Sequence, residues 1–224
     1  MPPPSATRPA LIGPRYYPEP SLPPPLGYQV EGGAPPAYLF HRGLRDPTIE
    51  HFELGLSTDP RSLQGRVLIP LHDAEGTLTG HAGRWPADPA PGDRAPHRFI
   101  SKYRFVGHGE FEPYNLHRVI AAGSMAPVFV TGSPFDVFHL WQRGCQCVVG
   151  LFTCEIREDA ILRLVHRLPG RPFTLLFDET IRGRGLRLQL VERLGRYAFV
   201  RAPRFHEDNS TVDTLTAAEI QEEL

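Results

Sequence analysis

Long apolar runs are missing from this sequence, and so is an excess of charge of either sign. No stretch reaches the about 18 consecutive apolar residues of a membrane span, so we expect no membrane partner. The start of the chain lacks the basic and then apolar pattern of a signal peptide, which favours a cytoplasmic location. The formal net charge is −1, so any nucleic-acid binding must come from a local basic patch.

Cysteine and lysine are also scarce. Cys145, Cys147 and Cys154 are an incomplete set for structural zinc, which takes four Cys or His ligands. Their odd number argues against a disulfide framework. We therefore expect three buried thiols in a reduced compartment and no zinc. Lys102 is the only lysine among 24 lysine and arginine residues, which makes it a position of interest.

Composition divides the chain into four parts. Residues 1–36 are rich in proline, which fixes φ and removes a backbone donor, so we predict an extended or disordered arm. Docking of this arm on a partner is the alternative. Residues 37–122 are predicted to form a small mixed α+β subdomain and residues 123–205 an α/β subdomain. Residues 206–224 are predicted to be an acidic tail with a short, solvated helix.

The second part contains signals for both helices and strands. A helix ended by glycine is predicted at 37–44, and another begins near Asp46, a candidate N-cap. A glycine-bounded, β-branched run predicts a strand at 65–71, and a hairpin turn leads to its partner at 77–84.

The third part alternates short strands and helices. Strands are predicted at 127–131, 147–151, 172–177 and 197–200, and helices at 135–143, 155–168 and 186–194. This alternation predicts a parallel sheet flanked by helices. Since chemistry in such sheets lies at the carboxyl ends of strands, residues 132–136 and 178–183 are the candidate site.

Several short motifs, in their order along residues 37–205, resemble the catalytic core of bacterial DnaG-type primases. The basic subdomain of that family is matched by residues 38–44, 52–55, 65–76, 80–84, 102–103 and 114–116. Residues 128–137 and 176–184 resemble the two halves of a Toprim metal site. The resemblance implies an α/β fold with a Toprim-type sheet and flanking helices, preceded by a small mixed α+β basic subdomain.

The family's metal site has Glu-Gly-x-x-Asp at the first strand end and Asp-x-Asp at the later one. Asp136 and Asp178 match this pattern, whereas Gly132 stands at the glutamate position and Thr180 at the second acid of the later pair. The resemblance therefore implies catalytic and metal-binding roles for Asp136 and Asp178, with Mg²⁺ or Mn²⁺ held weakly.

Two other acids are candidates for repair of this site. Glu179 adjoins Asp178, although neighbouring strand residues point to opposite faces, and Glu155 is more distant. The glutamate expected to act as general acid or base is missing. Because phosphoryl transfer depends on positioning and charge stabilisation, we expect weak catalysis or none.

Nucleic-acid and nucleotide binding is implied at four positions that match the family: Arg66, Arg84, Lys102 and Tyr103. Such a set suits a single strand, because cations track phosphates while an aromatic ring stacks on a base. Without the resemblance, solvated or structural cations would explain Arg84 and Lys102 equally well. Residues 104–105 depart from the family's small polar residues, so template contacts are expected to differ.

Three functions follow as hypotheses. The first is a weakly active or inactive subunit of a replication or mobile-element complex, with single-stranded DNA or RNA and proteins such as a helicase as partners. The second is an active DNA primase, or a Toprim nuclease, with altered acids. The third is a non-catalytic protein-interaction scaffold. We see no zinc-ribbon cysteines before the core and no helicase-binding domain after it, so a lone core is expected to need partners for loading.

Overall fold

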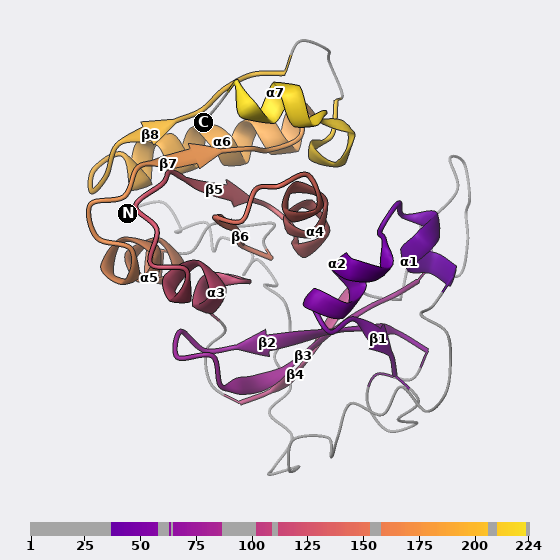
Figure 1. Ribbon diagram of the computed structural model, residues 1–224. Coiled ribbons are helices and arrows are strands. Elements are labelled where there is room, and N and C mark those ends of the chain that lie inside the picture. The colour runs from indigo at the N-terminus through magenta and orange to yellow at the C-terminus, as the bar shows by residue number, and fades with distance from the viewer. Residues whose placement is uncertain are drawn as a thin grey trace, which may run out of the picture.

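The computed structural model describes residues 37–57, 63, 65–86, 102–108, 112–152, 158–205 and 210–222. The predictions for the arm at 1–36, for Cys154 and for Glu155 lie outside the described residues. The described residues form two sheets, each with helices packed against it (Figure 1). In this part of the chain, no helix has the length and apolarity needed to cross a membrane.

The first sheet is antiparallel, with the strand order β1-β2-β3-β4. Its strands are β1 (Gly55–Leu56), β2 (Val67–His72), β3 (Leu78–Arg84) and β4 (Tyr103–Gly107). Helices α1 (Ala37–His41) and α2 (Asp46–His51) pack on the side nearer the second sheet, where α2 contacts α4 (Figure 1).

The predicted elements of this region are confirmed, with one correction, and the short strand β1 was not among the predictions. Gly43, with φ of 76°, follows α1, as the glycine signal indicates. The second helix begins at Asp46, but its N-cap is Arg45 and no side chain caps it, so the predicted Asp46 cap is wrong. Pro47 in the first turn has no N–H group, so the helix has one fewer unpaired donor that a capping side chain would have to satisfy. Strand β4 was not among the predictions.

The second sheet is parallel, as predicted, with the strand order β6-β5-β7-β8. Its strands are β5 (Val128–Thr131), β6 (Val148–Gly150), β7 (Phe173–Leu175) and β8 (Val200–Arg201). Its helices are α3 (Leu116–Ala121), α4 (Pro134–Gln142), α5 (Glu158–Arg167) and α6 (Ile181–Leu194). Helix α3 was not predicted, and α6 begins five residues before its predicted start at 186.

Each face of the second sheet has its own core. Strand residues alternate between faces, so Val128 and Val130 pack with α3, α5 and α6, whereas Phe129 packs with α4 and the first subdomain. The core that contains Phe129 therefore includes side chains from both sheets. It fixes the carboxyl ends of β5 and β7 next to the first subdomain.

The predicted tail packs partly against the core. Its elements are the 3₁₀ turn η2 (Val212–Thr214) and helix α7 (Ala217–Gln221), which begins with a capping box between Thr216 and Glu219. The side chains of Val212, Leu215 and Ile220 are buried against α4 and its surroundings. In α7 itself, Ala217, Ala218 and Glu219 are exposed, so the helix is solvated on one side while the buried Ile220 anchors it to the core.

Candidate functional site

Two of the predicted site residues, Asp136 and Asp178, lie at the carboxyl ends of adjacent strands. Asp136 is in the first turn of α4, where its Oδ2 accepts a 3.1 Å hydrogen bond from the Ser133 N–H in a capping box. Asp178 follows β7, and its Oδ1 accepts a 2.9 Å hydrogen bond from the Val212 N–H. The two strands pair directly, so the two carboxylates share one edge of the sheet.

The carboxylates lie within electrostatic reach of each other. Burial, followed by the charges of Asp178 and Asp213, raises the pKa of Asp136 to about 8. Burial also raises the pKa of Asp178; the Val212 N–H and the charge of Lys102 oppose this rise, while Asp213 adds to it. The charges of Asp178 and Asp213 therefore disfavour the ionised form of Asp136, and a cation bound there would relieve this repulsion.

Asp213 is the acid that sequence reasoning missed. It belongs to η2 in the tail, where the Arg42 guanidinium donates a 3.4 Å hydrogen bond to its Oδ2 and Thr211 donates to its Oδ1. Arg143 donates a 2.6 Å hydrogen bond to its backbone oxygen. The sequence offers one signal for the position of Asp213. The nearby apolar residues Val212 and Leu215 indicate that this segment returns to the core.

The residues between Asp178 and α6 have structural roles. The Thr180 hydroxyl accepts a 3.0 Å hydrogen bond from the Gly183 N–H and caps α6. Glu179 is buried at 4% exposure, and both of its oxygens accept hydrogen bonds from Arg187, which lowers its pKa. The expected repair by Glu179 is therefore wrong, because its carboxylate is engaged by Arg187.

The predicted cations differ in exposure. Lys102 is exposed, and its charge acts on Asp178. Arg84 is only 1% exposed, and its guanidinium carbon lies 5.7 Å from the ring centres of both Tyr38 and Tyr103. Lys102 precedes Tyr103, and Tyr103 pairs with Arg84 across β3 and β4, so these residues lie together. The structure thus presents Lys102 to solvent and keeps Arg84 inside.

Arg66 is also largely buried, at 8% exposure. It donates a 3.0 Å hydrogen bond to the Gly83 carbonyl and lies 5.5 Å from the Trp85 ring centre. Burial lowers its pKa, and the charges of Arg104 and Arg84 add to this effect.

Three half-buried aromatic residues line the boundary between the two sheets. The ring centres of Tyr103 and Phe105, on β4, lie 5.5 and 5.2 Å from that of Phe152, which follows β6. Burial raises the pKa of Tyr103 above its ordinary value, so its hydroxyl stays protonated. Phe152 has φ of 53°, in the left-handed region, so packing against β4 holds a backbone shape that a bulky residue rarely adopts.

The fit of a metal ion rests on the two aspartates. Among the described residues, no three or more His, Cys, Asp or Glu side chains form a group that could hold a metal ion. The Asp213 carboxylate is already engaged by Arg42. Asp136 and Asp178 supply hard oxygen ligands, and Mg²⁺ is commonly bound by one or two carboxylates with phosphate oxygens of a substrate. The residues therefore fit an ion that arrives with a phosphate ligand.

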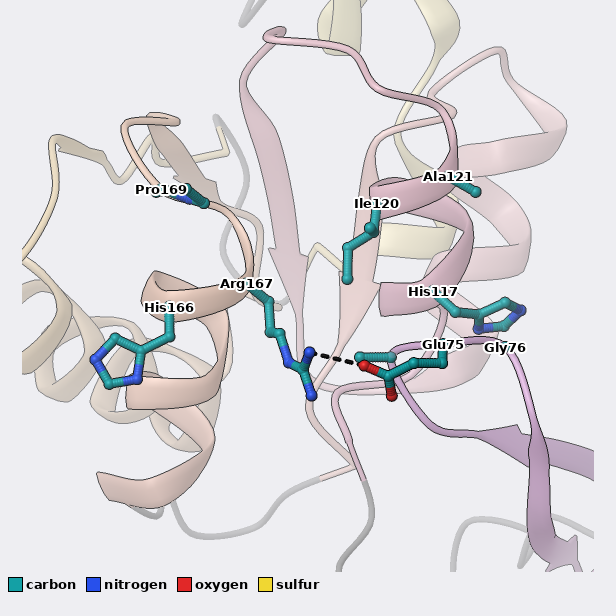
Figure 2. A pocket seen from close by; sticks show the side chains of 9 residues that line it. Glu75, Gly76, His117, Ile120, Ala121, His166, Arg167 and Pro169 are labelled. Atoms are coloured by element: carbon teal, nitrogen blue, oxygen red, sulfur yellow. Dashed lines mark hydrogen bonds and ion pairs between the residues drawn. The ribbon is translucent and has the colours of Figure 1, made fainter.

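One hollow of the described residues lies elsewhere, and none of the predicted site residues lines it. It has a volume of about 720 Å³ and lies between the β2–β3 turn, α3 and the end of α5 (Figure 2). Arg167 of α5 reaches Glu75 of the turn at 2.8 Å and joins the two subdomains (Figure 2). We assign the functional site to the carboxylate edge, because charged groups converge there.

Comparison with known proteins bears on the fold. No protein-family model matches the chain. The DNA primase of Mycoplasma pneumoniae is 24% identical over a match of 172 residues, and the match covers 69% of this chain and 26% of that primase. The Aquifex aeolicus primase, in its zinc-binding and RNA polymerase domains, superposes with a TM-score of 0.63 at 17% identity. That superposition covers 83% of this chain and 54% of the other.

Two further structures agree. The Escherichia coli primase catalytic core has a TM-score of 0.59 at 21% identity and covers 80% of this chain and 66% of its own. A DnaG primase catalytic domain bound to single-stranded DNA has a TM-score of 0.62 at 20% identity, with coverage of 84% and 68%. The chain has the fold of a bacterial primase catalytic core. The predicted fold class and the resemblance are therefore confirmed, and the chain spans about a quarter of the M. pneumoniae primase.

Proposed function

We propose that this primase-core-like protein binds single-stranded nucleic acid or nucleotide phosphates at the edge formed by β4 and the carboxyl ends of β5 and β7. The observation that carries the proposal is that the exposed Lys102 acts electrostatically on the Asp178 carboxylate, whose charge in turn acts on Asp136. The protein would act in DNA replication or in a mobile-element complex, with proteins such as a helicase as partners. The prediction of a cytoplasmic location belongs to this proposal.

The site offers separate contacts to each part of a nucleotide. The Lys102 ammonium is placed to contact a phosphate, and Tyr103 with its aromatic neighbours offers an apolar surface to a base. Asp136 and Asp178 would hold weakly bound Mg²⁺ or Mn²⁺ together with phosphate oxygens. Such an ion supplies neutralisation of phosphate charge. Support for the nucleic-acid ligand comes from the fold shared with a primase domain bound to single-stranded DNA.

Efficient primer synthesis is not part of the proposal. Gly132 stands where the family has its glutamate, Thr180 is occupied in capping α6, and Glu179 is paired with Arg187. None of these three positions therefore offers a carboxylate in the role of the family's missing acids. A weakly active or inactive binding subunit fits this arrangement best.

Binding of single-stranded DNA tests the proposal. We expect Lys102→Ala to weaken binding of a fluorescent oligonucleotide by about threefold to tenfold at low salt, because one phosphate contact is lost. The slope of log affinity against log salt should fall by about one. The matched control is Arg196→Ala, at an exposed arginine beyond the end of α6, which should change neither quantity. Equal losses in the two variants would contradict the site, and no binding at all would favour the scaffold hypothesis.

An active enzyme is the second candidate, favoured by the third carboxylate, Asp213. It is tested by primer synthesis from nucleoside triphosphates on a single-stranded template with Mg²⁺ or Mn²⁺. We expect no product above the background of the metal alone. Product that appears with the native protein and disappears in Asp178→Asn would overturn the proposal of weak or absent catalysis. Asp213→Asn would then show whether the third acid takes part.

A further inference from the structure

Helix α6 carries large apolar side chains on the side that faces away from the core. Ile181 is 87% exposed, Leu188 is 66% exposed and Val191 is 38% exposed. Their spacing of seven and three residues places all three on one side of the helix. The opposite side is already buried in the core through Leu186, Leu190 and Leu194. An apolar stripe left outside a packed helix is typical of a contact surface.

The residues around this stripe are arranged symmetrically about Leu188. Arg184 lies four residues before it, and Glu192 lies four residues after it. Their side chains are 39% and 72% exposed, respectively. Gly185 lies three residues before Leu188, with open space beside its Cα, and Val191 lies three residues after it. Each feature on one side of Leu188 therefore has a complementary feature on the other side.

We infer that α6 is the contact surface for a second copy of this chain, with the two helices antiparallel and Leu188 on the two-fold axis. About such an axis, the residue n positions before Leu188 lies opposite the residue n positions after it in the other copy. Arg184 then lies opposite Glu192, Gly185 opposite Val191, and Ile181 opposite Gly195 just beyond α6. Two large apolar side chains then meet glycines. Arg184 and Glu192, which within one chain contact Glu179 at 3.8 Å and Arg196 at 3.2 Å, meet each other across the axis.

Other occupants fit this surface less well. A parallel pair of helices would place Arg184 against Arg184 and Glu192 against Glu192. A nucleic acid would leave the exposed Ile181 and Leu188 without an apolar contact and would meet the Glu192 carboxylate. The net charge of −1 gives two copies almost no overall repulsion. A helix of 14 residues is about 21 Å long. Its contact is therefore small, and we expect a dissociation constant of about 10 to 100 µM.

Sedimentation velocity of the full chain measures this association. We expect the mass to rise from the 25.1 kDa of one chain towards twice that value between about 1 and 300 µM protein. Leu188→Asp should remain monomeric over this range, because it places two carboxylates on the axis. Since Leu188 is exposed, the melting temperature of the Leu188→Asp variant should match that of the native chain. An unchanged melting temperature shows that the variant has lost the contact between copies and has kept its fold. A native chain that stays monomeric throughout would overturn the inference.

The register is tested by crosslinking and by exchange of charges. Leu188→Cys should form an intermolecular disulfide on mild oxidation at least ten times faster than the exposed neighbour Gln189→Cys, which points away from the axis. Arg184→Glu and Glu192→Arg should each be monomeric alone and should form a heterodimer when mixed, because mixing restores both ion pairs. Equal crosslinking at 188 and 189, or no heterodimer from two folded variants, would refute this arrangement.

Discussion

Replacing Glu179 by alanine is expected to lower the free energy of unfolding by about 3–5 kcal/mol, because it leaves the Arg187 guanidinium buried without its carboxylate. Both side chains are 5% exposed, and the two Glu179 oxygens and the Arg187 fork form two hydrogen bonds. Glu179 also accepts a 3.2 Å hydrogen bond from the Phe205 N–H, so the segment after β8 would loosen too. Urea unfolding of both chains measures the difference.

The control is an ion pair on the surface of the same helix. Glu192→Ala breaks the pair with Arg196, whose side chain is 61% exposed, and should cost less than about 0.5 kcal/mol when measured on dilute protein. The paired replacement Glu179→Leu with Arg187→Met should recover most of the loss, since it removes both buried charges. If Glu179→Ala costs no more than Glu192→Ala, the pair does not stabilise the fold.

Gly183→Ala is expected to destabilise the chain by about 2–3 kcal/mol and to displace Asp178. A Cβ on Gly183 would lie 2.0 Å from the Asp178 carbonyl oxygen, and a backbone atom cannot rotate away as a side chain can. The strand end that carries Asp178 would have to move. We therefore expect weaker binding of single-stranded DNA in the presence of Mg²⁺, together with the loss in unfolding free energy.

Gly185→Ala is the matched control for this prediction. It lies in the same helix, and a Cβ there would meet no heavy atom within 4 Å. The alanine should stabilise the chain by about 0.5–1 kcal/mol through its higher helix propensity. If both alanine variants are stabilised by similar amounts, the close approach of Gly183 to Asp178 is absent in solution.

The sequence predicts those parts of the fold in which local pattern and tertiary packing agree. The buried strands β5 and β7 are short apolar runs bounded by turns, and their alternation with helices predicts the parallel sheet. Strand β4 is missed because its alternating residues, with Arg104 exposed, depend on pairing with β3. Such a strand depends on its neighbour more than on its own composition.

The candidate site was predictable only where residues continue a strand. Asp136 and Asp178 follow β5 and β7, so topology places them together. Asp213 comes from an irregular segment that Val212 and Leu215 tie to the core, and no local pattern places it beside the other two. The roles of Thr180 and Glu179 depend on where α6 begins, and helix boundaries follow from capping geometry that the residue pattern only suggests.

The ion pair between Arg42 and Asp213 also bears on how the protein matures during synthesis. These residues are separated by 171 positions, and the pair joins the first described helix to the tail. On the ribosome, the second sheet can fold around β5 and β7 before Asp213 has left the exit tunnel. The carboxylate edge then lacks its third acid and its link to Arg42 until Asp213 has emerged from the tunnel, so a nascent chain would hold a folded but unfinished site.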